Sequence, residues 1–297
     1  MEDYRRFLQP NVVAQLSNIE LRARLVVEGF ITGLHRSPYH GFSVEFAEHR
    51  QYNPGDDIRY IDWKVYGRTD KYYVKQFEEE TNLRCIIALD KSGSMRYASK
   101  GNISKFEYSA FLAASLAYLL MQQRDAVGLA LYDENLVSYI PPQSKTSHIY
   151  TLLKIIDQTT PTEKTGTAKA LNQLAEKLHR RGLVIVFSDF LDAPDSVVTA
   201  LKHFRHKKHE VIAFQVLDPR EMDFRFSGSV IFKDMETSET LQTQPIQLQR
   251  AYRETFQNFL NYIKKQCFEM NIDFNVVRTD EPFDKALRQY LTKRASL

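Results

Sequence analysis

Residues 85–94 read Cys85-Ile86-Ile87-Ala88-Leu89-Asp90-Lys91-Ser92-Gly93-Ser94, and they join an apolar run to a short polar loop. A continuous apolar run of this length is typical of a buried strand in a parallel sheet. The loop then places one carboxylate and two hydroxyls at alternate positions. Mg²⁺ prefers oxygen ligands and keeps several waters, so such a loop fills part of its coordination shell and leaves room for a partner. The stretch therefore predicts a strand that leads into a weak cation site.

Two later segments supply similar groups. Thr165-Gly166-Thr167 precedes a helical pattern, and a hydroxyl at a helix start either caps the helix or faces an ion in front of it. Leu183-Val184-Ile185-Val186-Phe187 is a second apolar strand, and Ser188-Asp189 follows it. Because the carboxyl ends of parallel strands share one edge of a sheet, we expect these groups to meet the first loop there.

The order Asp90, Ser92, Ser94, Thr167 and Asp189 resembles the metal-ion-dependent adhesion site of von Willebrand factor A-like domains. Thr165 is the rival for the threonine position, but Thr167 fits the Gly-Thr pattern of that family better. A second motif lies upstream. It comprises Tyr52-Asn53-Pro54-Gly55-Asp56-Asp57-Ile58-Arg59-Tyr60-Ile61-Asp62-Trp63-Lys64, then Gly67-Arg68-Thr69 and Phe77-Glu78-Glu79-Glu80.

The upstream motif resembles the signature of the prokaryotic domain-of-unknown-function family numbered fifty-eight, and the resemblance covers roughly residues 40 to 290. Members of that family carry a von Willebrand factor A-like domain and often neighbour MoxR-type AAA+ ATPases. The resemblance implies Mg²⁺, with Mn²⁺ as a substitute, at Asp90, Ser92, Ser94, Thr167 and Asp189. It also implies a protein partner that completes the site with an Asp or Glu carboxylate, and a MoxR-type ATPase as that partner.

Composition narrows the class of protein. The chain has 297 residues, of which 43% are hydrophobic, so it can bury a full core. Its 40 basic and 37 acidic side chains give a net charge of +3, which does not favour nucleic acid or an anionic membrane as the main partner. Met1 to Arg6 lack the features of a signal peptide, and no apolar run is long enough to cross a bilayer. We therefore expect a cytoplasmic protein without direct membrane insertion.

The pattern after residue 83 alternates strands and helices. We expect strands at 84–89, 126–132, 183–188 and 210–216, with helices at about 105–123, 147–157, 167–180 and 195–206. This order predicts a doubly wound, mostly parallel α/β sheet of the Rossmann-like kind. A late β-hairpin at 230–241, a long helix, a last strand at 275–277 and a final helix complete a predicted domain over 84–297. Residues 1–83 are predicted to form an N-terminal helix and a β-rich segment.

The remaining charged segments have competing interpretations. The residues from Asp56 to Arg68 either pin the β-rich segment around Trp63 through ion pairs or form a docking surface for a partner. Glu78-Glu79-Glu80 is typical of a solvated edge, since alternate strand residues point to opposite faces. The basic run 202–209 invites a nucleic-acid or histidine-metal interpretation, but Val197, Leu201 and Phe204 indicate that it is the wet face of an amphipathic helix.

Two functional classes follow from the same cation site. The first is a non-enzymatic, metal-dependent protein-interaction module, which acts as an adaptor or chaperone-like partner of a MoxR-type ATPase. The alternative is a metal-assisted hydrolase that uses the same ion. A hydrolase needs a base near the bound water or a Gly-x-Ser-x-Gly elbow, and Ser92 and Ser94 have neither by motif. The sequence therefore favours the interaction module.

Overall fold

The chain forms two compact units, one of Met1–Gly33 with Leu83–Leu297 and the other of Leu34–Asn82. In the smaller unit, β1 (Arg50–Gln51) pairs antiparallel with β2 (Tyr73–Val74). The computed structural model describes residues 9–14, 18–35, 50–51, 66–67, 72–74, 83–162, 166–226, 228–233 and 240–294. The signature segment 52–64, with Asp56, Asp57, Arg59, Asp62 and Trp63, lies outside these residues, as do Arg68 and Glu78 to Glu80.

The larger unit is built on a six-stranded sheet in the order β10-β7-β6-β3-β4-β5. All neighbouring strands are parallel except the edge pair β4 and β5. The prediction of a doubly wound, mostly parallel α/β sheet is therefore confirmed. The strands are β3 (Arg84–Asp90), β4 (Ala126–Tyr132), β5 (Leu136–Gln143), β6 (Leu183–Ser188), β7 (Glu210–Leu217) and β10 (Asp273–Arg278).

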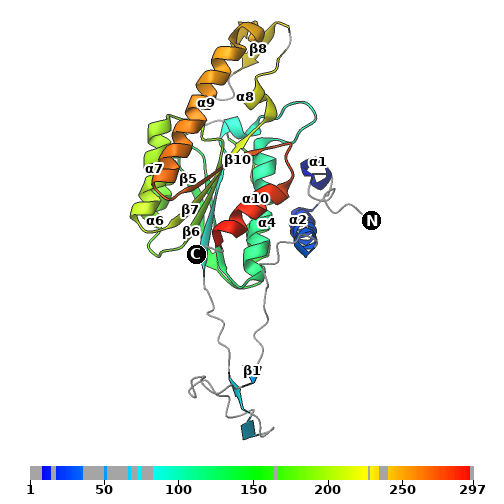
Figure 1. Cartoon of the computed structure of the whole chain (residues 1–297), viewed down its shortest axis with the longest axis vertical. Coiled ribbons are helices and arrows are strands. Elements are labelled where there is room, and N and C mark those ends of the chain that lie inside the picture. Colours follow the sequence, from blue (N-terminus) through cyan, green and yellow to red (C-terminus); the bar gives the residue numbers. More distant parts are fainter. Residues whose placement is uncertain are drawn as a thin grey trace. The chain divides into compact units, whose positions relative to one another are not determined.

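Helices cover both faces of the sheet (Figure 1). On one face, α6 (Thr167–Lys177), α7 (Pro194–His206) and α9 (Pro245–Glu269) bury apolar side chains against β3, β6 and β7. On the other face, α4 (Lys105–Gln122) packs against β3 and against α5 (His148–Gln158) and α10 (Phe283–Arg294). Because β3 and β6 are covered on both sides, their side chains are apolar at consecutive positions, as the sequence analysis assumed.

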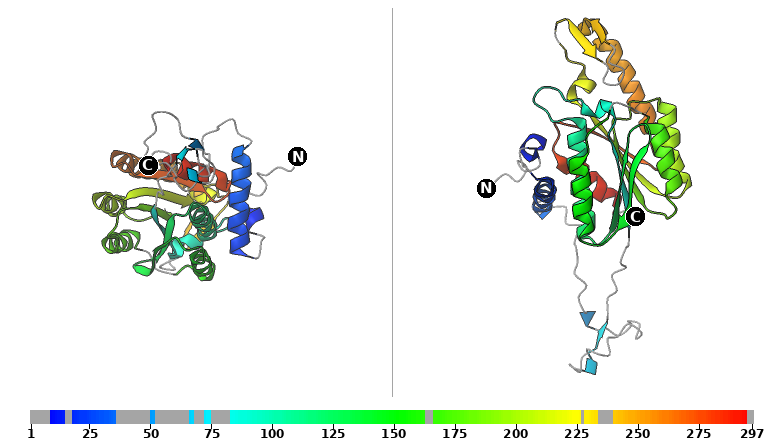
Figure 2. Two further views of the ribbon diagram at one scale, coloured as in Figure 1. Left: turned by 90° about the horizontal axis from the view of Figure 1, so that it is seen from below. Right: turned by 180° about the vertical axis from the view of Figure 1, so that it is seen from behind.

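The predicted N-terminal helix is present as α2 (Ile19–His35), which follows the short α1 (Pro10–Val13). It lies next to α4 and crosses it (Figure 2). The guanidinium of Arg22 lies 4.6 Å from the ring centre of Phe111 on α4. In the structure α2 thus belongs to the same unit as the sheet. The division of the chain into 1–83 and 84–297 stays a prediction.

A small arm extends from the sheet between β7 and β10. It consists of α8 (Pro219–Asp223), the antiparallel strands β8 (Val230–Lys233) and β9 (Thr240–Thr243), and the first part of α9. Stacked aromatic rings hold it together, with the ring of Phe224 lying 4.1 Å from that of Tyr252 and 5.5 Å from that of Phe232. Within the residues that the structure describes, no helix combines the length and the apolar composition that a membrane span requires.

Candidate metal site

The candidate site lies where the connections of the sheet diverge. β3 and β6 are adjacent and parallel, but β3 leads through α4 to β4 on one side, and β6 leads through α7 to β7 on the other. A crevice forms at such a switch point, outside the carboxyl ends of the strands. Asp90 is the last residue of β3, and Asp189 directly follows β6. The topology therefore places both predicted carboxylates at the edge where ligands bind.

Asp90 is fully buried and accepts hydrogen bonds at both of its oxygens. The backbone N–H of Ser92 donates to Oδ1 at 2.9 Å, which closes the tight turn after β3. The hydroxyl of Ser188 donates to Oδ2 at 2.6 Å. The hydroxyl of Thr167 lies 3.4 Å from the same Oδ2, which is longer than a usual hydroxyl hydrogen bond. Three separate elements thus direct polar groups at one carboxylate.

The other two predicted hydroxyls belong to Ser92, the N-cap of the short 3₁₀ helix η3 (Gly93–Arg96), and to Ser94 within this helix. The Oγ atoms of Ser92 and Ser94 are 3.3 Å apart. Thr167 is the first residue of α6 and is buried, because Gly166 before it lets the chain approach Glu134 closely. A Cβ at Gly166 would lie 3.0 Å from the Cα of Glu134. The rival Thr165 lies outside the described residues.

Asp189 is buried as well, but its carboxylate is held differently. Oδ1 accepts the backbone N–H of Leu191 at 3.2 Å, and Oδ2 accepts the ammonium of Lys105 at 2.7 Å. The side chain of Gln215 fixes the backbone, because its Nε2 donates to the carbonyl of Asp189 at 2.8 Å. A carboxylate with these partners is oriented within the fold and already compensated by a positive charge.

Lys105 and Glu221 are the charged residues that sequence analysis missed. Besides Asp189, the ammonium of Lys105 contacts Oε1 of Glu221 at 2.6 Å, and its side chain is 0% exposed. Glu221 belongs to α8, and its other oxygen accepts the N–H of Asp218 in a capping box. One signal in the sequence was a lysine at the start of an otherwise apolar helix, since a buried lysine requires an anionic partner.

Burial and neighbouring charges shift the pKa values of Asp90 and Asp189 in opposite directions. Burial, followed by the charge of Asp189, raises the pKa of Asp90 to about 7. Burial alone would also raise the pKa of Asp189, but the charge and hydrogen bond of Lys105 outweigh it and hold that pKa below its ordinary value. Burial raises the pKa of Glu221 despite Lys105. Burial opposes the charge on Lys105, and the two carboxylates raise its pKa above the ordinary value.

The donor set around Asp90 is suited to a hard divalent cation. It offers carboxylate and hydroxyl oxygens, which Mg²⁺ and Mn²⁺ accept, and few negative charges. Among the described residues, no group of three or more His, Cys, Asp or Glu side chains is placed to hold an ion, so the candidate site depends on hydroxyl oxygens as well. The structure brings Asp90, Ser92, Ser94, Thr167 and Asp189 to one edge of the sheet. Their role as metal ligands stays a prediction.

The basic run 202–209 is placed elsewhere. Val197, Leu201 and Phe204 are buried in α7, whereas Lys202 and His206 are exposed on its outer face. Nε2 of His203 lies 2.9 Å from Glu176, and its Nδ1 lies 2.9 Å from the amide oxygen of Asn172. The interpretation as a wet helix face agrees with residues 202–206 but not with His209, which follows the helix and is buried.

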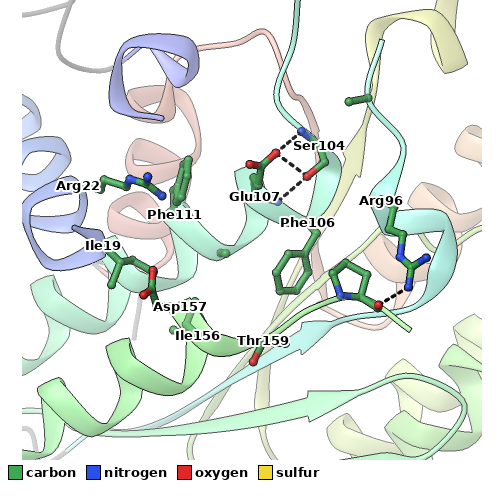
Figure 3. Close-up of a pocket in the computed structure, with 13 residues that line it drawn as sticks. Ile19, Arg22, Arg96, Ser104, Phe106, Glu107, Phe111, Ile156, Asp157 and Thr159 are labelled. Atoms are coloured by element: carbon green, nitrogen blue, oxygen red, sulfur yellow. Dashed lines mark hydrogen bonds between the residues drawn. The ribbon is translucent and has the colours of Figure 1, made fainter. Parts of the chain in front are cut away.

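A separate pocket of about 530 Å³ lies between α2, the start of α4 and the end of α5 (Figure 3). Three of its charged side chains are engaged within the protein. Arg22 donates to the carbonyl of Ala14, Arg96 donates to the carbonyl of Pro161 at 2.6 Å, and Glu107 binds Ser104 in the capping box of α4. The pocket shares none of the predicted metal ligands.

Comparisons with known proteins give a family but no activity. Residues 48–264 match the model of the family described as "Protein of unknown function DUF58". Uncharacterized proteins of Mycobacterium bovis and Mycobacterium tuberculosis are 29% identical over 232 residues, which cover 77% of this chain and 72% of theirs.

Among solved structures, the conserved hypothetical protein BatB of Bacteroides thetaiotaomicron is 18% identical, with a TM-score of 0.48. That match covers 72% of this chain and 100% of the other. The SpRpn10 VWA domain is 10% identical, with a TM-score of 0.40, over 70% of this chain and 95% of the other.

Proposed function

The chain belongs to the family of proteins of unknown function DUF58, and we propose that it is a non-enzymatic protein-interaction module whose binding depends on Mg²⁺ or Mn²⁺. Asp90 and the hydroxyls of Ser92, Ser94 and Thr167 would hold the ion, with Asp189 acting through water. The ion would supply an electrophilic position that attracts a carboxylate. The protein's own residues orient these oxygens and bury Asp90, Ser92 and Thr167 away from bulk water.

The observation that carries the proposal is the convergence of polar groups on the buried Asp90 at the switch point of the sheet. Asp90 is 0% exposed, and the backbone N–H of Ser92 and the hydroxyls of Thr167 and Ser188 approach it from three elements. A fold does not bury a carboxylate at a loop edge without compensation, because the desolvation cost is high. A cation that binds there would relieve this cost and would still have coordination positions for a partner's Asp or Glu.

The proposed partner follows from the resemblance of the upstream motif, residues 52–80, to the family signature. A MoxR-type AAA+ ATPase, a class that often neighbours such proteins, would offer the carboxylate and form a chaperone-like pair with this chain. Neutral hydroxyl ligands leave the ion with unbalanced positive charge, so binding of the ATPase would require the ion.

Removal of the central carboxylate tests the proposal. We expect Asp90→Ala and Ser92→Ala proteins to remain folded but to lose Mn²⁺ binding in calorimetry, and to lose capture of a purified MoxR-type ATPase. EDTA should abolish capture by the wild type. Glu254→Ala is the matched control, because Glu254 is 64% exposed on α9 and takes no part in the site. A folded Asp90→Ala protein with unchanged Mn²⁺ affinity would show that the site is assigned wrongly.

A further inference from the structure

The buried ion triad of Asp189, Lys105 and Glu221 shares Asp189 with the candidate metal site. The lysine ammonium lies 2.7 Å from Asp189 and 2.6 Å from Glu221, with side chains exposed by 0%, 2% and 17% for Lys105, Asp189 and Glu221. Charge–charge interactions at such burial are screened far less than on the surface. The lysine therefore acts on whatever ion binds beside Asp189.

The triad is held rigidly by three elements. The capping box of Ser104 and Glu107 fixes the start of α4, and Lys105 is the first residue of that helix. The N–H of Leu191 holds Asp189, and the N–H of Asp218 holds Glu221. Each carboxylate thus has a backbone partner besides the lysine, which orients it toward the ammonium.

The formal charges of the connected side chains balance a divalent ion. Asp90, Asp189 and Glu221 carry one negative charge each when ionised, and Lys105 carries one positive charge, which leaves two negative charges. A bound Mg²⁺ or Mn²⁺ would bring this wider group to neutrality, while the ion itself, with Asp90 as its one charged ligand in direct contact, would keep part of its positive charge. Without the lysine, the loaded site would keep an excess negative charge, and an approaching carboxylate would be repelled.

We propose that Lys105 sets the charge of the metal site, so that it weakens binding of the ion itself and strengthens binding of a partner's carboxylate to the ion. The proposal rests on the proposed function and makes Lys105 a positioning and charge-tuning residue, which touches Asp189 and not the partner. It explains why a lysine is buried at a place where an apolar side chain of similar size would avoid the desolvation cost.

The two effects have opposite signs, and a purely structural role of Lys105 would not produce them. If the lysine only braced the fold, its loss would lower both affinities or leave both unchanged. If it tunes charge, its loss should raise the affinity for the ion and lower that for the carboxylate. Glu221→Gln removes a negative charge from the same triad, so it should shift each affinity the other way.

The experiment uses the full chain and two probes, Mn²⁺ alone and acetate added to the Mn²⁺-loaded protein. Free Mn²⁺ is measured by electron paramagnetic resonance, and acetate binding by the water-proton relaxation of the bound ion. We expect Lys105→Met to bind Mn²⁺ about tenfold more tightly and acetate about tenfold more weakly. Removal of one unit charge from a buried site is large enough to produce shifts of this size. Glu221→Gln should bind Mn²⁺ more weakly and acetate more tightly.

Circular dichroism and thermal unfolding establish that each variant is folded, and Glu221→Gln carries the test if Lys105→Met does not fold. Equal or parallel shifts of the two affinities in the folded variants would overturn the inference while leaving the metal site intact. Absence of Mn²⁺ binding in the wild type and in both variants would overturn the proposed function together with the inference. Binding by Lys105→Met alone would support the charge effect but reject metal dependence of the native protein.

Discussion

Asp90 shows how a single buried carboxylate makes the candidate site sensitive to pH. Its pKa stands at about 7 rather than near the ordinary 3.8, chiefly because of burial and then because of Asp189. A cation must displace the proton, so below pH 7 each unit of acidification should weaken Mn²⁺ binding about tenfold, and above pH 7 the affinity should level off. Calorimetry between about pH 5.5 and pH 8.5 measures this dependence. An affinity that is flat across this range would contradict the assignment of Asp90 as the central ligand.

At the residue scale, the sequence was sufficient to predict where polar groups lie at the ends of strands. Asp90, Ser92, Ser94 and Asp189 could be predicted because the strand pattern fixes where each loop begins. The partners of Lys105 could not, since Asp189 and Glu221 are 84 and 116 residues away from it in the chain. Only the folded topology brings such pairs together. The charge balance of the site therefore depends on contacts that no local motif contains.

At the scale of elements, the buried strands were the easiest to predict and the sheet edge the hardest. The apolar runs of β3 and β6 are short and rich in Ile and Val, which favours strands that are covered on both faces. β5 was missed since none of its eight residues is fully buried and it contains Pro141 and Pro142. Prolines are tolerated there because β5 is an edge strand with one unpaired side. The five-residue α8 was also missed, although Asp218 and Pro219 are typical of a helix start.

The contact between β4 and this irregular edge strand gives a stability prediction. A Cβ at Gly128 would lie 2.5 Å from the carbonyl oxygen of Ile140 and 2.7 Å from Cδ1 of Ile86. We therefore expect Gly128→Ala to lower the free energy of unfolding by about 1 to 3 kcal/mol, as overpacking does in well-packed cores. Urea denaturation measures the change. Val137→Ala on β5 is the control, because Val137 is 53% exposed and should cost less than about 0.5 kcal/mol.

At the scale of the whole molecule, the family signature and the candidate metal site fall into different units. The predicted ligands belong to the unit of Met1–Gly33 and Leu83–Leu297, whereas the segment from Asp56 to Arg68 belongs to Leu34–Asn82. Both motifs are visible in the sequence, but the upstream motif lies outside the residues that the structure describes. Its two interpretations, a packed structural segment and a docking surface, therefore make different predictions for a chain that lacks the smaller unit.

Replacement of residues 34–82 by a flexible Gly/Ser linker separates these roles. The larger unit contains the complete six-stranded sheet, its covering helices and all five predicted ligands, so we expect the shortened chain to fold and to bind Mn²⁺ with wild-type affinity. If the ion is the docking point, the shortened chain should also capture a MoxR-type ATPase, and EDTA should release it. Calorimetry and capture by the purified ATPase measure the two properties separately. Retained Mn²⁺ binding with lost capture would move the docking surface to Leu34–Asn82, because the ion would then be present but insufficient to hold the partner.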